Sequence, residues 1–170
     1  MQDSFTPIFN MLLSMGVIVY VFAIVFLLLQ RKNLTSFFSK YGLLTICGIS
    51  GIATISSLLY YHVSGFVPCD LCWYQRIFIY SSFLISLLAL IKKDSIHVIK
   101  PYLVMLTVIG GCISIVHNII YYTGFNPLPC SATASCTARY VFEFGFITIP
   151  LMALVTFVLT LVLLLLTKKK

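Results

Sequence analysis

The chain has 170 residues, of which 61% are hydrophobic and only 9% are charged. Soluble domains carry about 25% charged residues, so this composition excludes an ordinary soluble protein. The formal net charge of +7 could indicate nucleic acid, but the sequence contains no basic recognition element, and we expect no nucleic-acid partner. Membrane lipid is the expected surroundings of most of the chain.

Continuous apolar runs, close to the about 20 residues that a helix needs to cross a bilayer, recur along the chain. These runs do not alternate with polar residues, and backbone polar groups in lipid must be satisfied within the segment, so we predict helices. The predicted fold class is an all-α integral membrane protein with spans over residues 8–30, 43–61, 71–91, 101–122 and 147–167. No linker or internal repeat divides the sequence, which predicts a single membrane domain over residues 1–170.

The basic residues predict the orientation. If the five spans alternate, one side of the membrane receives Arg31, Lys32, Lys40, Lys92, Lys93, Lys100, Lys168, Lys169 and Lys170. Only Arg76 and Arg139 fall on the other side. Excess Lys and Arg marks the cytoplasmic face, so the N-terminus is expected outside and the C-terminus in the cytoplasm. Asp3 precedes the first apolar run and basic residues follow it, the reverse of a cleavable signal peptide.

Proline and glycine refine this scheme. Lys100–Pro101 predicts a helix start, because proline is tolerated in the first turn, where its missing N–H is not needed. Gly48, Gly51, Gly110 and Gly111 permit close helix contacts, and ordinary packing is the role expected of them. The short cytoplasmic connections favour antiparallel neighbours in a bundle.

Two loops are predicted on the outer side, over residues 62–70 and 123–146. The longer loop contains Pro127 and Pro129 and a Ser/Thr/Ala-rich stretch, which predicts irregular structure. Its aromatic segment, residues 140–144, is expected to lie at the membrane interface.

The six cysteines fall into two groups. Cys47 and Cys112 lie within predicted spans and are expected to be inert packing residues. The remaining four, on the predicted outer side, are Cys69, Cys72, Cys130 and Cys136. The outer face of a plasma membrane is oxidising, so disulfides form and persist there. The orientation came from Lys and Arg alone, and the placement of the cysteines agrees with it independently.

Cys69 and Cys72 form a C-x-x-C motif where the third span begins. The unpaired N–H groups and the dipole at a helix start stabilise a thiolate, which is the reactive form of cysteine. Arg76 lies four residues after Cys72, on the same helix face. An arginine just inside lipid normally has a partner or a function, although an arginine that extends its charge to the membrane edge is the simpler alternative.

Cys130 and Cys136 form a second pair, separated by five residues in the longer outer loop. Thiol–disulfide exchange proceeds by thiolate attack, so a pair in a loop is placed to meet both another protein and the first pair. Two alternatives remain open: structural disulfides, and a zinc site formed by all four outer cysteines. The C-x5-C spacing fits common zinc sites poorly, and we predict no metal.

Three other side chains near the outer ends of the spans are candidates. His62 and His117 are suited to proton transfer near neutral pH, although each also fits an interfacial or helix-contact role. Trp73 is a candidate apolar wall of a binding site, a weak indication in a chain with 15% aromatic residues.

The segment Pro68-Cys69-x-Leu71-Cys72-Trp73-Tyr74-Gln75-Arg76 resembles the signature of the DsbB disulfide-bond-forming membrane proteins, most closely their short Gram-positive-type branch, BdbC. The C-x5-C pair, Ile113-Ser114-Ile115-x-His117 and Phe146-Ile147-Thr148-Ile149-Pro150 are similar to that branch too. The likeness covers roughly residues 43–167. In the related vitamin K epoxide reductases the C-x-x-C follows the loop pair, whereas here it comes first.

The resemblance implies an antiparallel four-helix transmembrane bundle in a bacterial cell membrane, to which this chain adds an N-terminal span of unknown role. It implies an enzyme that reoxidises a DsbA-like extracytoplasmic thioredoxin-fold oxidase and passes the electrons to a membrane quinone, menaquinone or ubiquinone. Cys130 would exchange with that partner, and Cys136 would link to Cys69. Cys72 would face the quinone, with Arg76 holding its ring or its developing negative charge. His62, His117 and Trp73 are the other candidates for the quinone site.

The sequence also bears on three other functions. A relay that delivers reductant outward would need a thiol pair on the cytoplasmic side, and the sequence offers none there. A transporter usually places carboxylates at membrane depth, whereas Asp3, Asp70, Asp94 and Glu143 fall in loops or at edges. A scaffold with structural disulfides only is the third alternative.

Overall fold

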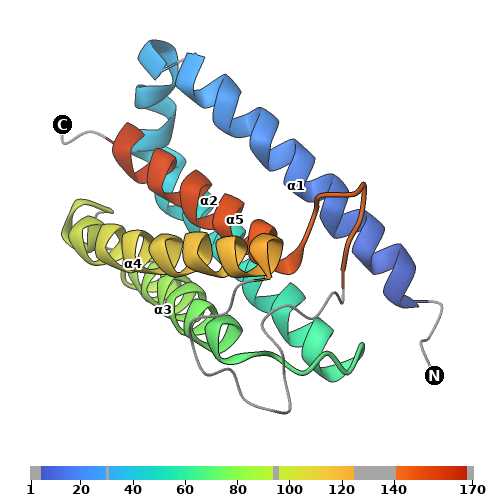
Figure 1. Cartoon of the computed structure of the whole chain (residues 1–170). Helices are drawn as coiled ribbons and strands as arrows, with labels where there is room; N and C mark the ends of the chain where they lie inside the picture. The colour runs from blue at the N-terminus through green and yellow to red at the C-terminus, as the bar shows by residue number, and fades with distance from the viewer. Residues whose placement is uncertain (1–4, 30, 94–95, 125–140, 168–170) are drawn as a thin grey trace.

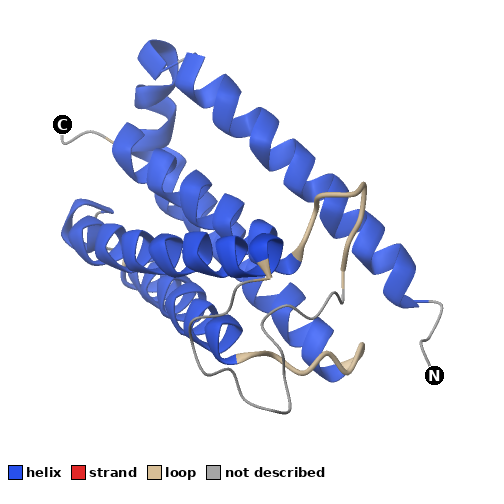
Figure 2. Cartoon of the chain, viewed as in Figure 1, coloured by secondary structure: helices blue, strands red, loops and turns tan. Residues whose placement is uncertain are grey.

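The computed structural model describes residues 5–29, 31–93, 96–124 and 141–167, which form an all-helical bundle. Its five helices are α1 (Phe5–Leu29), α2 (Arg31–His62), α3 (Asp70–Lys92), α4 (Ile96–Thr123) and α5 (Ile149–Leu166). Successive helices run back and forth (Figure 1), and no strand occurs within the described ranges (Figure 2). The predicted all-α fold, a four-helix bundle with an additional N-terminal helix, is confirmed.

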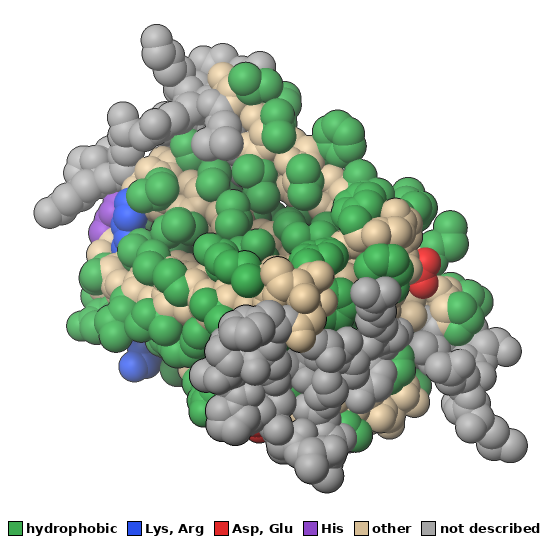
Figure 3. All heavy atoms as spheres, in the orientation of Figure 1, with side chains coloured by type: hydrophobic (Ala, Val, Ile, Leu, Met, Phe, Trp, Pro, Cys, Tyr) green, Lys and Arg blue, Asp and Glu red, His purple; other side chains and the backbone are tan. Residues whose placement is uncertain are grey.

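All five helices are long and apolar enough to cross a membrane. The 23 residues of α3 correspond to about 35 Å at 1.5 Å per residue, which exceeds a hydrocarbon core of about 30 Å. In the face seen in Figure 3, hydrophobic side chains cover the middle, and charged side chains lie toward the two ends. This distribution is that of a multi-pass membrane protein.

Helices α2 and α4 extend well before the starts of the predicted spans. Helix α2 begins at Arg31, so most of the expected connection over residues 31–42 is helical. Helix α4 begins at Ile96, and Pro101 therefore lies inside the helix. The prediction that Pro101 marks a helix start was wrong. The earlier turn of α4 buries Ile96 in the main core, a gain that offsets the hydrogen bond lost at proline.

The core of the bundle is formed by α2, α3, α4 and α5. Helix α4 packs extensively against both α3 and α5, and α2 packs against α3 and α5. Gly110 of α4 allows the closest of these approaches, because a Cβ atom there would meet the Phe157 ring of α5 at 2.4 Å. Gly51 likewise faces Phe83 of α3 at 3.0 Å. The expected packing role is confirmed at these two glycines, whereas a Cβ atom on Gly48 would meet nothing within 4 Å.

Helix α1 lies along one side of this core, and most of its contacts are with α5 rather than with its chain neighbour α2 (Figure 1). Its outward face exposes many large apolar side chains, for example Phe22 and Leu29. The alternating helices place the starts of α1, α3 and α5 and the ends of α2 and α4 together at one end of the molecule. We call this end the cysteine end, because Cys69 lies there, directly before α3.

Candidate functional site

The C-x-x-C pair lies at the start of α3. Cys69 is the residue that caps this helix, in an extended conformation, and its carbonyl accepts the first helical hydrogen bond, from Trp73 N–H at 3.0 Å. Cys72 follows one turn later, so both sulfur atoms lie at the positive end of the helix dipole. The structure holds them as two thiols, with the Sγ atoms in hydrogen-bond contact at 3.0 Å. The predicted placement of the motif at a helix start is confirmed.

His117 of α4 brings a titratable group to this pair from 48 positions along the chain. Its Nε2 lies 3.7 Å from Cys69 Sγ, and its Nδ1 lies 3.2 Å from Gln75 Nε2. An amide nitrogen can only donate, so Nδ1 accepts and the ring proton resides on Nε2, facing the sulfur. His117 and Gln75 are almost fully buried, at 2% and 3% exposed. Gln75 thus orients the His117 ring so that its Nε2–H points at the Cys69 sulfur.

These contacts lower the pKa of the Cys69 thiol well below its ordinary value. The largest cause is the Cys72 thiol, which donates a hydrogen bond to Cys69 when Cys69 is the thiolate. Burial acts in the opposite direction, and His117 adds a further lowering through its hydrogen bond and charge. This shift favours the negative charge of the reduced pair on Cys69, and the thiolate is the form in which a cysteine reacts.

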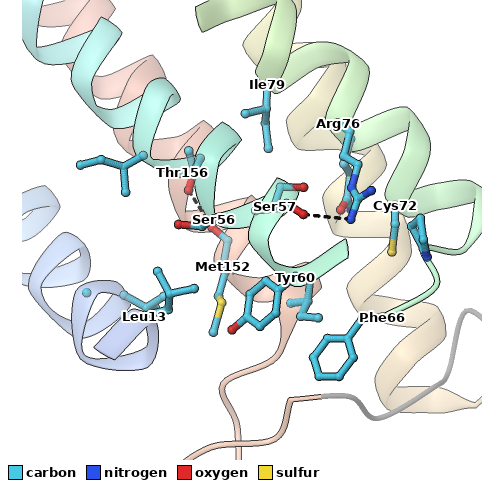
Figure 4. A pocket seen from close by; sticks show the side chains of 18 of the residues that line it. Leu13, Ser56, Ser57, Tyr60, Phe66, Cys72, Arg76, Ile79, Met152 and Thr156 are labelled. Carbon is cyan, nitrogen blue, oxygen red and sulfur yellow. Dashed lines mark hydrogen bonds between the residues drawn. The ribbon is translucent and has the colours of Figure 1, made fainter. Parts of the chain in front are cut away.

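A cavity of about 310 Å³ lies between the helices, beside Cys72 and on the side of the cysteine pair away from His117. Its walls come from α1, α2, α3, α5 and the loop between α2 and α3. The lining residues at the cysteine end are Pro68, Cys72, Gln75, Arg76, Ser57, Tyr60 and Phe66. Cys72 lines this cavity and Cys69 does not. In Figure 4, Cys72 and Arg76 stand side by side on α3 at one end, with Met152 and Thr156 of α5 farther along.

Arg76 is the one strongly basic side chain among the residues that line the cavity. Its Nη2 donates to the carbonyl oxygen of Ser57 at 3.4 Å (Figure 4), and its guanidinium carbon lies 5.3 Å from the Trp73 ring centre and 5.8 Å from that of Tyr61. Within the described ranges no carboxylate pairs with it. A positive charge inside an apolar bundle is costly, and the contacts with two aromatic rings and one carbonyl oxygen compensate it only in part.

The structure brings some of the predicted site residues together and leaves others apart. Cys69, Cys72, Arg76 and His117 form one cluster, and Trp73 joins it from a half-exposed position beneath Arg76. His62 ends α2 as an exposed residue against the edge of Tyr61 and is not among the residues that line the cavity. Cys130 and Cys136 lie outside the described residues.

Gln75 was missed as a functional residue, although it belongs to the motif. The spacing was the available signal, because residues 72, 75, 76 and 79 share one face of a helix. The structure shows that this face lines the cavity. An uncharged amide on that face of a membrane helix indicates a polar contact. The contribution of α1 to the cavity was also missed, and its sequence carries no sign of it.

The donor atoms of Cys69, Cys72 and His117 lie within 4.8 Å of one another, close enough to ligate one metal ion. A structural zinc site is closed by four protein ligands, and this group supplies three. The expectation of no metal stays a prediction.

An apolar helix bundle with two thiols in contact at a helix start, beside a cavity, defines a class: a multi-pass membrane protein with a site suited to thiol–disulfide chemistry. The family described as "Disulfide bond formation protein DsbB" matches residues 39–167. The chain belongs to this family, as its sequence motifs predicted.

Curated relatives agree. The chain is 40% identical over 121 residues to "Probable disulfide formation protein C 1" of Bacillus anthracis, covering 70% of this chain and 86% of that one. It is 39% identical over 119 residues to "Disulfide bond formation protein C" of Bacillus subtilis, covering 69% and 85%. It is also 43% identical over 112 residues to "SPbeta prophage-derived disulfide bond formation protein B" of the same species, covering 65% and 74%. No solved structure matches. Helix α1 lies outside the matched range.

Proposed function

We propose that this chain is a quinone-dependent thiol–disulfide oxidoreductase that reoxidises a DsbA-like extracytoplasmic protein and so drives disulfide formation. The observation that carries the proposal is the division of labour within the C-x-x-C pair. Cys72 lines the cavity beside Arg76, whereas Cys69 meets His117 away from it. One sulfur is placed for an acceptor in the membrane and the other for exchange with a second cysteine pair.

The cavity suits a quinone ring in size and in lining. Its volume of about 310 Å³ is at the lower end of the about 300–1,000 Å³ typical of small-molecule sites. Most of its walls are apolar, and its polar groups gather at the Cys72 end. A bound quinone supplies an acceptor for two electrons and two protons. The Cys69 thiolate and the Cys72 thiol lose two electrons and one proton as their sulfur atoms join in one disulfide bond, and the second proton comes from the medium, which took it up when Cys69 ionised.

The surrounding side chains have distinct tasks in this scheme. Arg76 offers N–H donors and positive charge where negative charge develops, the kind of fixed electrostatic stabilisation that contributes most to catalysis in buried sites. His117 holds a proton at Nε2 against Cys69 Sγ, and Gln75 fixes the ring in that orientation. His62 and Trp73 lie beyond the cavity lining, Trp73 supporting Arg76 through its ring face.

The remaining parts of the relay rest on the sequence. Cys130 exchanges with the DsbA-like partner, and Cys136 then links to Cys69, by thiolate attack through mixed disulfides. The excess of Lys and Arg favours an orientation with the cysteine end and the N-terminus outside and the C-terminus in the cytoplasm. The Gram-positive relatives favour menaquinone as the acceptor.

The test is quinone reduction by the purified protein, supplied with a reduced DsbA-like protein, in wild type and Cys72→Ala. We expect turnover in wild type and its loss in Cys72→Ala, with Cys47→Ala as the matched control that keeps wild-type turnover. A wild-type protein that reduces neither menaquinone nor ubiquinone, while folded and with outer disulfides intact, would instead indicate a scaffold with structural disulfides.

A further inference from the structure

Helix α1 lies outside the range that matches the family, yet it lines the cavity with Leu12, Leu13, Gly16, Val17 and Tyr20. We propose that α1 forms the lipid-side wall of the acceptor cavity, that the seam between α1 and α2 receives the prenyl tail of the quinone, and that Gly16 keeps this passage open. The inference rests on the proposed function, because it takes the ring to lie at Cys72.

The α1 residues that line the cavity follow helical spacing. Leu13, Gly16, Val17 and Tyr20 stand at positions i, i+3, i+4 and i+7, so one continuous stripe of the helix faces the cavity. Figure 4 shows Leu13 across the cavity from Cys72 and Arg76. Helix α1 therefore bounds the part of the cavity that is remote from the reactive sulfur.

This stripe is fixed by contacts on either side of it. Toward the cysteine end, the Phe9 ring meets Tyr60 of α2 edge-on, with centroids 5.1 Å apart. Val17 packs in a buried cluster with Ile147 and Val155. Farther along, Ile24 packs against the main core of the bundle. The wall is part of the folded structure rather than a loosely attached segment.

Between these contacts the cavity opens to the lipid-facing surface. Leu12 of α1 and Ile52 of α2 both line the cavity, and yet they are 66% and 54% exposed. These two residues therefore mark a mouth on this side, and Val67 of the loop between α2 and α3, which also lines the cavity and is 48% exposed, marks a second one at the cysteine end. Ala53 and Ser56 continue the α2 side of the passage inward. An apolar mouth between two helices that make few direct contacts suits a flexible hydrocarbon chain.

Gly16 stands within this passage. A Cβ atom there would meet no neighbouring atom within 4 Å, in contrast to Gly110 and Gly51, where a ring occupies that space. Close helix packing therefore does not require glycine at position 16. A larger side chain would extend into the cavity and reduce the room for a tail without a backbone clash.

The passage at α1 is continuous with the end of the cavity that holds Cys72 and Arg76, and this indicates which ligand group occupies it. A ring at Cys72 and Arg76 leaves the apolar length of the cavity, bounded by Leu13, Gly16 and Met152, free for an attached chain. A prenyl chain is apolar and flexible, and its far end is soluble in lipid beyond the mouth. The tail thus adds binding energy at α1, while the electron transfer occurs at α3.

The test compares menaquinone, which carries a prenyl tail, with menadione, which has the same ring and no tail, as acceptors for Gly16→Leu. We expect the KM for menaquinone to rise about tenfold, equivalent to about 1.4 kcal/mol of lost binding. The KM and kcat for menadione should stay within about twofold of wild type, because the tail-free ring lies at Cys72, at the other end of the cavity from Gly16. Gly48→Leu is the matched control, because Gly48 is also a helical glycine with open space around it, but it lies outside the cavity.

Equal kinetics of Gly16→Leu and Gly48→Leu with menaquinone would overturn the inference and leave the proposed function intact. An equal loss with both quinones in a folded Gly16→Leu protein would also overturn it. If thermal unfolding shows that Gly16→Leu does not fold, Ala53→Leu fills the same passage from α2 and is judged by the same criterion. A wild type that reduces neither quinone contradicts the proposed function itself.

Discussion

The two walls of the cavity, α3 on one side and α1 on the other, differ in how their surroundings are packed. Helix α3 is held by α2 and α4, with Phe83 against Gly51 and with the Gln75–His117 contact fully buried. On α1, Gly16 faces open space, and the neighbouring Leu12 is largely exposed. The rigid wall carries the groups whose geometry decides the chemistry. The open wall has only to remain apolar, which suits access from the membrane.

The largest effect should come from the rigid wall, at Arg76. Arg76→Met keeps much of the apolar stem and removes the donors, and we expect quinone turnover to fall about 100-fold, as for the loss of a donor to developing charge elsewhere. Arg76→Lys, which retains the charge without the planar fork, should recover part of the rate. Steady-state turnover measures both. Wild-type turnover in Arg76→Met would show that the arginine merely extends its charge to the membrane edge.

The charge on Cys69 gives a pH-dependent test of the same wall. Because its pKa is lowered in the folded, reduced protein, the thiolate is present at neutral pH and is lost only as the pH falls through that lowered pKa. Alkylation of Cys69, followed by mass spectrometry of its peptide, should be nearly constant between about pH 6 and pH 8 in wild type. In Cys72→Ala the main cause is gone, and the rate should rise about 100-fold over the same range, tenfold per pH unit below an ordinary thiol pKa. Identical flat profiles would contradict the assignment of Cys72 as donor.

A packing test separates the tight and open regions without reference to activity. Gly110→Ala drives a methyl group into the Phe157 ring, and we expect a loss of about 1–3 kcal/mol in the free energy of unfolding. Gly16→Ala and Gly48→Ala meet no neighbour and should be neutral or stabilise by up to about 1 kcal/mol, the helix propensity gain of alanine. Unfolding in mixed micelles measures all three. Equal destabilisation at Gly16 and Gly110 would contradict the open space at Gly16 and remove the distinction between the α1 wall and the tightly packed α4–α5 contact.

The smallest effect is expected far from the cysteine end. Lys100 Nζ donates to the carbonyl oxygen of Thr167 at 2.6 Å, which ties the start of α4 to the end of α5. Lys100→Met should lower the free energy of unfolding by about 0.5–1.5 kcal/mol, the range for a typical hydrogen bond, because water screens the charge of the partly exposed Lys100, and it should leave quinone turnover unchanged. A change in turnover would mean that the two ends of the bundle are coupled.

The sequence predicted the helices and the family because both depend on strong local signals. Apolar runs demand helices in lipid, and the segment around Cys69 and Cys72 places a reactive pair at a helix start. Helix starts were harder to place, since the burial of Ile96 outweighs the cost of Pro101 inside α4. The pairing of His117 with Cys69 joins residues on different helices, and no local pattern marks that distance.

The role of α1 was out of reach for a different reason. In a soluble protein a cavity-lining face differs from the outer face in polarity, but in lipid both faces are apolar. Leu13 and Val17 on the inside resemble Phe22 and Val25 on the outside, so periodicity cannot separate them. Orientation in the membrane and the chemistry of Cys130 and Cys136 stay predictions.

The central claim is that electrons leave the Cys69–Cys72 thiols for a quinone, and a single-turnover measurement tests it most directly. Reduced Cys130→Ser/Cys136→Ser protein is mixed without oxygen with one equivalent of menaquinone. Quinol is followed by absorbance and the remaining thiols by alkylation and mass spectrometry. The account predicts one quinol formed for each Cys69–Cys72 disulfide, with the loop pair absent. Quinone that stays oxidised while both thiols remain free in the folded protein would contradict it.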